Sequence, residues 1–387
     1  MAVEYEPYEV ARLVNVHKHP DPWFWVRYSA HPYIGCQHGC EYCYWRERKY
    51  YPYQDPADFA RCIKVKTNAP ALLRKELGRL PREPIVVGDW QPAEANFRLS
   101  RQMLEVCLDL DFPVFLLEKS HYILRDLELI QEINRRSHAV VAFSIIATPE
   151  SPHYPLLKRF EPHVPLTRQR FKAMKAFAQA GIPTGTAFMP ILPYIYDDGA
   201  NLEAVVRWTR DNGGAFVLAG GLTLADVQKG WFLEKLGQIR PDLVSRYEEL
   251  YTGDAYGPPM SYWGPIGQRV YELCQRHGLS DRMPRYIPPG PLATNRRLAE
   301  YLAEKSYRLE LAQEPDYRLW AYRKAWWALD DLEEDVCQIY EEQGKKGLMA
   351  IKGIGKKLAS EVALWLEENE DGPREESLRG SVDPALG

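Results

Sequence analysis

Three cysteines close together near the N-terminus are the residues of this chain best suited to chemistry. Cys36, Cys40 and Cys43 are separated by three and by two residues. Three thiolates on one short loop are typical ligands of an iron–sulfur cluster or of zinc, because soft thiolates select these metals over hard cations. A [4Fe–4S] cube needs four ligands, so three cysteines would leave one iron open to a small molecule. The next cysteine, Cys62, lies beyond a Tyr- and Pro-rich stretch in an expected strand.

A structural zinc site is the alternative. Zinc binds a closed tetrahedral set of Cys and His ligands, commonly as two separated pairs, and the sequence has no second pair nearby. His38 could supply a fourth ligand, but it lies between two of the cysteines on a tight loop, which is poor geometry for closing the same ion. The spacing and the aromatic Tyr44 that follows it therefore favour the iron–sulfur cluster.

Length and composition fit an enzyme with an appended module. The chain has 387 residues, is 45% hydrophobic and carries a formal net charge of −4. This length suggests two or more domains, and the net charge gives no global sign of nucleic-acid binding. No apolar run reaches membrane-spanning length, and the N-terminus lacks the pattern of a secretory leader. Seven cysteines with three clustered indicate a reducing environment, so we expect a cytoplasmic protein, of unknown oligomeric state.

Strand-like and helix-like stretches alternate after the cysteines. Such alternation predicts parallel strands with helical crossovers, and a single barrel-like sheet is the simplest α/β architecture. The expected strands are 63–65, 85–87, 114–117, 139–146, 184–192 and 216–218, and the expected helices are 70–80, 98–110, 124–135, 168–179 and 202–210.

Polar side chains follow successive strands of this predicted sheet. Asp89 and Glu94 come after one strand, Lys119 ends the next, and Ser144 lies near the end of the one after. Any one of them could be a solvated loop residue. Because ligands bind at the carboxyl ends of parallel strands, their recurrence there predicts a binding site.

These motifs resemble the radical S-adenosylmethionine (AdoMet) superfamily. The matching stretches are 33–44, 89–94 with Arg98 and Leu99, and 119–126, and they are similar to the branch that contains spore photoproduct lyase. The resemblance covers about residues 25–300 and implies a partial parallel (β/α)6-type barrel. It also implies a [4Fe–4S] cluster whose open iron binds AdoMet, an external electron donor such as flavodoxin or ferredoxin, and cleavage of AdoMet to methionine and a 5′-deoxyadenosyl radical.

The same resemblance implies roles for four further residues. Lys119 and Ser144 would hold the AdoMet carboxylate, and Tyr44 would contact the adenine. Gly88-Asp89 stands where other members carry a Gly-Gly-Glu run, so Asp89 would face the AdoMet amino group with a shorter side chain. An ammonium and a hydroxyl suit a carboxylate, and an aromatic ring suits a purine.

One departure from spore photoproduct lyase concerns the hydrogen-atom donor. That enzyme uses a cysteine just after the second strand, whereas residues 88–94 contain no cysteine. Cys107 lies among apolar residues of an expected helix and is more simply explained as core. Tyr33, Tyr42 and Tyr44 could relay a hydrogen atom, although aromatic residues near a cluster are more often packing. The sequence therefore argues against the same reaction by the same donor.

The second informative region is C-terminal. Residues 347–360 predict a helix, a Gly-x-Gly turn at Gly353 and Gly355, and a second helix whose N-terminus is free to bind phosphate. Lys352, Lys356 and Lys357 are the expected phosphate contacts. Trp320, Trp326 and Trp327 fall on one upstream helix, where two are expected in the core and one could stack on a base.

This region resembles a helix-hairpin-helix DNA-binding motif. Across about residues 317–368 it is similar to the N-terminal helical domain of family-X DNA polymerases. The alternative is an ordinary helical hairpin with glycine caps. Residues 341–360 carry five lysines against two glutamates, which favours binding of DNA through phosphates, while 331–335 and 367–376 are acidic.

Together these features predict a radical AdoMet enzyme with a DNA-binding module. The expected domains are a barrel over 1–295, a connecting helix over 296–316, a helix-hairpin-helix domain over 317–368 and a disordered tail over 369–387. The expected activity is abstraction of hydrogen from a nucleic-acid substrate in DNA repair or modification. The alternatives are a radical AdoMet enzyme acting on RNA or protein, or a non-catalytic DNA-binding protein with a structural cluster.

Overall fold

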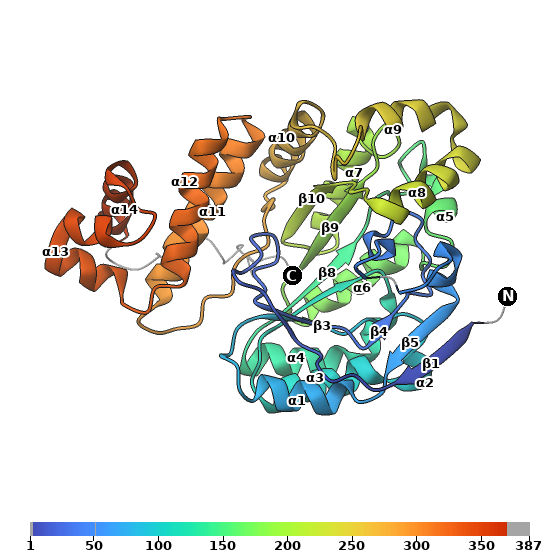
Figure 1. The fold of residues 1–387 in the computed structure, drawn as a ribbon, viewed down its shortest axis with the longest axis horizontal. Helices are drawn as coiled ribbons and strands as arrows, with labels where there is room; N and C mark the ends of the chain where they lie inside the picture. Colours follow the sequence, from blue (N-terminus) through green and yellow to red (C-terminus); the bar gives the residue numbers. More distant parts are fainter. Residues whose placement is uncertain (1–2, 51, 370–387) are drawn as a thin grey trace, which may run out of the picture. The chain divides into compact units, whose positions relative to one another are not determined.

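A seven-stranded sheet organises the first part of the chain in the computed structural model, which describes residues 3–50 and 52–369 (Figure 1). Its strand order is β10-β9-β8-β7-β6-β3-β2, and every neighbouring pair is parallel except β2 with β3. The six parallel strands confirm the predicted partial (β/α)6 barrel. The strands are β2 (Asn15–Val16), β3 (Tyr28–Ala30), β6 (Ile85–Val87), β7 (Val114–Glu118), β8 (Ala139–Ser144), β9 (Thr184–Ile191) and β10 (Phe216–Gly221).

Helices connect these strands, and three more follow the last strand, β10. They are α1 (Ala69–Leu77), α2 (Glu94–Phe97), α3 (Leu99–Asp109), α4 (Leu127–Arg136), α5 (Leu157–Phe160), α6 (Thr167–Gln179), α7 (Gly199–Asp211), α8 (Asp226–Ile239), α9 (Val244–Leu250) and α10 (Met260–Arg276). Parallel neighbouring strands require such crossovers, and the helical crossovers bury the outer face of the sheet. All of these helices belong with the sheet to one compact unit, Met1–Tyr286.

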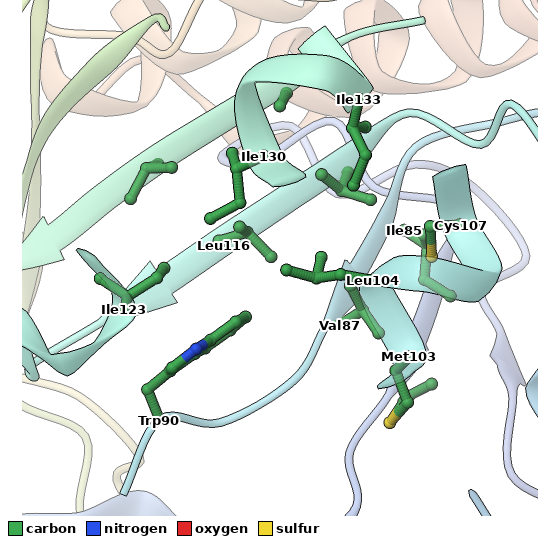
Figure 2. Close-up of a cluster of buried hydrophobic side chains, with 14 of the residues drawn as sticks. Ile85, Val87, Trp90, Met103, Leu104, Cys107, Leu116, Ile123, Ile130 and Ile133 are labelled. Carbon is green, nitrogen blue, oxygen red and sulfur yellow. The ribbon is translucent and has the colours of Figure 1, made fainter. Parts of the chain in front are cut away.

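Buried side chains from sheet and helices form the core between them. Figure 2 shows Ile85 and Val87 of β6, Leu104 and Cys107 of α3, and Ile130 of α4 meeting in one apolar cluster. All five are 1% exposed or less, which confirms Cys107 as a core residue. The core thus fixes the strands whose ends carry the predicted site.

A second sheet corrects the expectation that a single sheet holds all strands. Residues 63–65 were expected in the barrel, but β5 (Cys62–Lys66) lies between β1 (Glu4–Tyr8) and β4 (Tyr33–Ile34) in a separate three-stranded sheet. The periodicity of β5 marks it as a strand but does not select its partner. β5 pairs instead with β1 and, antiparallel, with β4, the strand just before the cysteines. The first barrel strand is instead the short β3, which the sequence pattern did not reveal.

The second unit, Ile287–Gly387, is helical over its described residues. It contains α11 (Ala293–Leu311), α12 (Asp316–Asp330), α13 (Val336–Ala350) and α14 (Lys356–Glu368), and α11 packs along α12. The segment expected to connect the domains is therefore part of this unit. Gly344, with φ +58°, interrupts α13. Residues 370–387 of the predicted tail lie outside the described residues.

The buried Asn295 ties the helices of the second unit together. Its amide donates to the carbonyl oxygens of Leu332 and Glu334 at 3.3 and 2.8 Å and accepts from the backbone N–H of Val336 at 2.9 Å. One side chain thus satisfies three backbone groups in the turn between α12 and α13.

None of the described helices, in either unit, has the length and apolar character needed to cross a membrane.

Candidate active site and nucleic-acid interface

The three cysteines lie on the loop that joins β4 to β5. Antiparallel pairing of these two strands closes the base of the loop, with Tyr33 opposite Val65. Gly35 precedes the first cysteine with φ +82°, and a Cβ atom there would lie 2.9 Å from the carbonyl oxygens of Phe59 and Cys62. Only glycine fits both the backbone angle and this close approach.

A buried arginine holds the cysteine loop in place. Arg46 is 2% exposed, and its guanidinium donates to the carbonyl oxygens of Gly39, Cys40 and Pro56 at 3.3, 3.3 and 2.6 Å. Its Cζ atom lies 4.6 Å from the ring centroid of Trp231 on α8. The loop is therefore anchored by hydrogen bonds and by a cation–π contact before any metal binds.

The loop cysteines suit a cluster with three protein ligands. All three are free thiols, and burial, together with neighbouring charges that include Cys40 and Cys43, raises the pKa of Cys36. Burial likewise raises the pKa of Cys40 to about 12. Such thiols ionise at neutral pH only beside a strongly positive group, which a metal centre supplies. Cys62 stands apart, because the charges acting on its thiol come from β1 and the segment before β5.

Within the described part of the chain, no group of three or more His, Cys, Asp or Glu side chains is arranged to hold a metal ion. A cubane cluster makes no such demand, since its protein ligands bind different irons. Burial lowers the pKa of His38 to about 3, and the charged groups that act on it most strongly are Lys119, Arg170 and Glu161. His38, the fourth ligand that the zinc alternative needs, is therefore a buried, neutral imidazole close to these charged groups.

Asp89 follows β6 and is connected to the cysteine loop through Gln91. The Nε2 atom of Gln91 donates to the Asp89 carboxylate at 2.7 Å and to the carbonyl oxygen of Gly35 at 3.1 Å. Its Oε1 atom accepts from the backbone N–H of Gln37 at 2.9 Å. Burial raises the pKa of Asp89 to about 7, although the hydrogen bonds from Gln91 act in the opposite direction. The predicted amino-group ligand therefore lies against the cysteine loop.

Two other carboxyl groups lie near Asp89. Glu118, at the end of β7, accepts from the backbone N–H of Trp90 at 3.1 Å, and burial and then Asp89 raise the pKa of its carboxyl well above the usual range. Glu94 accepts from the Tyr33 hydroxyl at 2.6 Å and from Arg125 at 3.0 Å. Glu94, a candidate from its position after a strand, is therefore occupied by contacts that fix the fold.

Lys119 and Ser144 are brought together, although 25 residues separate them. The Lys119 ammonium donates to the Ser144 hydroxyl at 2.8 Å, to the Tyr42 hydroxyl at 2.8 Å and to a Glu161 carboxylate oxygen at 2.9 Å. Ser144 in turn donates to the carbonyl oxygen of Met189 at 3.0 Å. All three N–H groups of the ammonium are engaged. An incoming carboxylate must therefore replace one of these acceptors.

Glu161 is the centre of a buried network that the sequence did not reveal. Its carboxylate, 1% exposed, pairs with Lys119 and Arg170 and accepts from the Tyr42 hydroxyl. Arg170 on α6 also donates to the carbonyl oxygen of Ser144 at 2.7 Å. Burial alone would raise the pKa of Glu161, but Arg170 and Lys119 more than offset it, and the pKa falls to about 2.

The sequence pointed to Lys119 and Ser144 of this network from their positions at the ends of successive strands. Tyr42 lies between two of the cysteines, where an aromatic residue is more often packing than part of a site. Glu161 and Arg170 follow ordinary loop and helix patterns.

Tyr44, the predicted adenine contact, is 46% exposed, and its ring packs edge-on against Trp45 and Tyr50 at 6.3 and 5.6 Å between centroids. Its role stays a prediction.

In the second unit the Gly-x-Gly turn joins α13 to α14. Gly353 has φ +93°, and a Cβ there would lie 3.3 Å from the Lys324 carbonyl oxygen on α12, so glycine is required for the turn to approach that helix. Gly355 is the N-cap of α14 and gives no side-chain cap, which leaves backbone N–H groups at the helix start without that partner. Lys356 and Lys357 occupy the first turn, and both are exposed.

The charges along α14 oppose the usual helix preference. Acidic residues stabilise a helix N-terminus and basic residues its C-terminus, yet α14 begins with Lys356 and Lys357 and ends with Glu367 and Glu368. Positive charge and free N–H groups at one end create a site for an anion such as phosphate. The acidic residues lie at the far end of the same helix.

The lysines around the turn share one property. In the described residues none of them has a salt-bridge partner, whereas Lys305, Arg308, Arg318 and Arg323 of the same unit all pair with glutamates. The unpaired, exposed set comprises Lys324, Lys345, Lys346, Lys352, Lys356 and Lys357. Cations without protein partners are free to contact phosphates.

The three tryptophans of α12 divide between core and surface. Trp326 is 2% exposed, whereas Trp320 is 45% exposed and lies one turn before Lys324, the residue that contacts the hairpin turn. Trp327 packs edge-on against both rings. Of the three rings, Trp320 is therefore the most exposed to solvent, and the Arg323 guanidinium lies 5.5 Å from its centroid.

Comparison with known proteins bears on both units. The first unit has the fold of spore photoproduct lyase: the structure of that enzyme complexed with dinucleoside spore photoproduct matches with a TM-score of 0.52 at 14% identity, over 71% of this chain and 81% of that one. A family model described as a helix-hairpin-helix domain matches residues 293–371. The chain thus combines a radical AdoMet fold with a helix-hairpin-helix domain, as the sequence predicted.

The sequence relatives define the family. An uncharacterized protein of Mycobacterium tuberculosis, Rv2578c, is 32% identical over 262 residues, which are 66% of this chain and 75% of the relative. An uncharacterized protein of Methanocaldococcus jannaschii, MJ0683, is 29% identical over 174 residues, or 44% of this chain and 63% of that protein. The chain belongs to the family of the mycobacterial protein.

The buried network yields a stability prediction. Replacing Glu161 with Gln should lower the free energy of unfolding of the metal-free protein at pH 7 by about 3–5 kcal/mol, because it leaves two cations without their buried anion. Chemical denaturation measures this change. Glu150→Gln, which breaks a pair of Arg207 with a 47%-exposed carboxylate, should cost about 1 kcal/mol or less.

The pH dependence of that difference has a definite sign. The folded pKa of Glu161 is about 2, below the ordinary value near 4.5. Its contribution should therefore be complete above about pH 4.5 and decline as the pH falls toward 2. Equal stability of wild type and Glu161→Gln at pH 7 would contradict the assigned role of this carboxylate.

Proposed function

We propose that this protein is a radical AdoMet enzyme that acts on nucleic acid, in DNA repair or modification. The observation that carries the proposal is the meeting of the cysteine loop with the carboxyl ends of β6, β7 and β8. There Asp89 is bonded to the loop through Gln91, and Lys119 bonds to Ser144. Asp89, which suits the AdoMet ammonium, and Lys119, which suits the AdoMet carboxylate, thus lie beside the three-cysteine loop.

The residues of the chain have separate tasks in this proposal. Cys36, Cys40 and Cys43 would hold the cluster, which would supply the electron for cleavage of AdoMet to methionine and a 5′-deoxyadenosyl radical. Asp89 orients the amino group and Tyr44 the adenine. An external low-potential protein such as flavodoxin or ferredoxin delivers the electron.

Lys119 and Ser144 would hold the carboxylate of AdoMet. Lys119, Glu161 and Arg170 together carry one net positive charge, which a single carboxylate neutralises. Because the Lys119 donors are already engaged, binding exchanges one internal acceptor for the AdoMet carboxylate. The buried network keeps the ammonium in the same place before and after this exchange.

The helix-hairpin-helix domain supports nucleic acid as the substrate class. Six of its lysines have no salt-bridge partner among residues 287–369, and with the N-terminus of α14 they suit phosphates, which give affinity without reading sequence. Trp320 adds a ring for a base beside them. The Gly88 to Glu94 segment has no cysteine and Cys107 is buried in the core, so hydrogen return by a cysteine at this position is excluded from the proposal.

The metal content tests the centre of the proposal. Anaerobically purified or reconstituted protein should contain about four irons per chain, and alanine at Cys36, Cys40 or Cys43 should remove most of this iron. Metal analysis and the visible absorption of the cluster report the result. Cys62→Ala should keep its iron, because Cys62 lies outside the ligand group. Stoichiometric zinc without iron would refute the iron–sulfur assignment.

Cofactor binding tests Lys119. Lys119→Ala should weaken AdoMet binding by about 10- to 100-fold, the loss expected for a charge-assisted hydrogen bond of about 1.5–3 kcal/mol. Calorimetric titration of the reconstituted protein measures the affinity, and reduced samples should form less 5′-deoxyadenosine. The exposed Lys172→Ala is the matched control. Unchanged affinity with full iron content would remove Lys119 from the site.

The salt dependence of DNA binding tests the hairpin. Replacing Lys356 and Lys357 with Ala should reduce the slope of log K against log salt by about 2 for duplex DNA, since two phosphate contacts and their released counterions are lost. Affinity should fall similarly for different sequences. Arg308→Ala with Arg318→Ala changes the charge equally at residues already paired with glutamates and should leave the slope nearly intact. Full-strength binding by the lysine variant would make the hairpin a scaffold only.

A further inference from the structure

The segment after the cysteines, together with Tyr256, exposes a group of tyrosine rings, of which the cofactor site accounts for Tyr44 alone. Tyr44, Tyr50 and Tyr256 are 46%, 44% and 47% exposed. The rings of Tyr44 and Tyr50 lie 5.6 Å apart between centroids. The Lys49 ammonium lies 4.8 Å from the Tyr50 centroid and 5.8 Å from that of Tyr256. We call these four residues the tyrosine patch.

The patch is held in place by a buried carboxylate. Glu47, 3% exposed, accepts from the Lys49 ammonium at 2.8 Å and from the Tyr256 hydroxyl at 3.1 Å. The carbonyl oxygen of Tyr256 accepts from the backbone N–H of Leu224 at 2.9 Å. Two segments 209 residues apart in sequence are thereby joined at fixed positions. Large apolar side chains of this unit are mostly buried, so a fixed and exposed ring group indicates a contact surface.

The patch adjoins the metal-binding loop. Tyr44 directly follows Cys43, and the next residues, Trp45 and Arg46, form a 3-10 helix with it. The backbone N–H of Arg48 donates to the Asp226 carboxylate at 3.2 Å, which ties the segment to the start of α8. A molecule bound on the patch therefore lies beside the loop at which the reactive species would form.

We propose that the tyrosine patch binds an unpaired nucleobase of the nucleic-acid substrate by stacking. This inference rests on the proposed function and names its substrate class as single-stranded or locally unpaired nucleic acid. Bases inside a duplex are covered by their neighbours, so only an unpaired base offers its face to a tyrosine ring. The exposed Arg48 places a positive charge next to the rings, which complements the phosphate attached to that base.

An electron-donor protein is the competing occupant, and the geometry favours it less. Even the small interfaces of electron-transfer complexes cover up to about 600 Å² on each partner, more than four partly exposed side chains present. Glu47 neutralises Lys49 beneath the patch, so the local charge is too small to steer an acidic protein strongly. Aromatic rings, rather than net charge, dominate this surface, and nucleobases stack on aromatic rings.

The experiment compares single-stranded and duplex DNA binding by the full-length, reconstituted protein. The probes are a fluorescein-labelled oligodeoxythymidylate of about 12 nucleotides and the same strand in a duplex. Tyr50→Ala with Tyr256→Ala should weaken single-strand binding by about tenfold or more, since stacking contributes about 1–3 kcal/mol per base. Duplex affinity should change by less than about twofold, because the hairpin grips phosphates. Tyr44 is left unchanged, since it is the predicted adenine contact.

Two further variants control for structural damage. Tyr50→Phe with Tyr256→Phe keeps the rings and should restore most of the single-strand affinity. Tyr122→Ala removes a 38%-exposed tyrosine that also lies under a cation, Arg125, at 4.9 Å but outside the patch, and it should leave single-strand affinity unchanged. AdoMet affinity and iron content should equal those of the wild type in every variant.

The outcomes separate this proposal from the proposed function. Unchanged single-strand affinity in the alanine variant overturns the patch proposal, and slower cluster reduction by flavodoxin but not by dithionite would then identify a donor-docking surface. An equal loss for single strand and duplex also overturns it. Failure of the wild-type protein to form 5′-deoxyadenosine refutes the enzymatic function, whatever the DNA measurements show.

Discussion

A single buried carboxylate is the constraint on which the arrangement of the first unit depends. Glu161 follows α5, yet it bonds to Tyr42 of the cysteine loop, to Lys119 after β7 and to Arg170 on α6. A buried ion pair is costly unless all its members are satisfied, so these elements must meet in one geometry. The cysteine loop and two adjacent strand ends are thereby fixed relative to one another before a cofactor binds.

The cysteine loop itself is held by a few local contacts. Pairing of β4 with β5 closes its base, Gly35 allows the close approach of two carbonyl groups, and Arg46 satisfies three more carbonyls from inside. A loop of this length would otherwise be free to change shape. These contacts hold the three thiols on one short loop and place Tyr44 and Tyr50 on the adjoining surface.

The two units divide the proposed work by physical principle. The first gathers buried charges and thiols, where low solvent exposure makes each electrostatic contact strong. The second exposes a helix N-terminus and lysines that have no salt-bridge partner within the described residues. Such groups can contact many phosphates, but these contacts do not distinguish base sequences. In this proposal the second unit binds phosphates of any sequence, and the first unit stacks on an unpaired base. The two together would determine which nucleic acids reach the active site.

The sequence alone determined the features that depend on local pattern. Cysteine spacing marked the candidate cluster loop, β–α alternation predicted the partial barrel, and Gly353 with its lysines marked the hairpin, because each signal lies within a short stretch. Polar residues after successive strands likewise pointed to Asp89, Lys119 and Ser144, and the structure does bring the last two into contact.

Tertiary structure decided what depends on partners distant in sequence. β5 reads as a strand in either sheet, and only its pairing with β1 and β4 places it outside the barrel. Glu161 and Arg170 look like surface residues in the sequence, because burial of a charge is set by the elements that pack around it. The tyrosine patch is similar, since Tyr256 joins Lys49 through Glu47 only after the chain has folded. Local periodicity reports which residues form an element, whereas long-range pairing and burial determine which residues form a site.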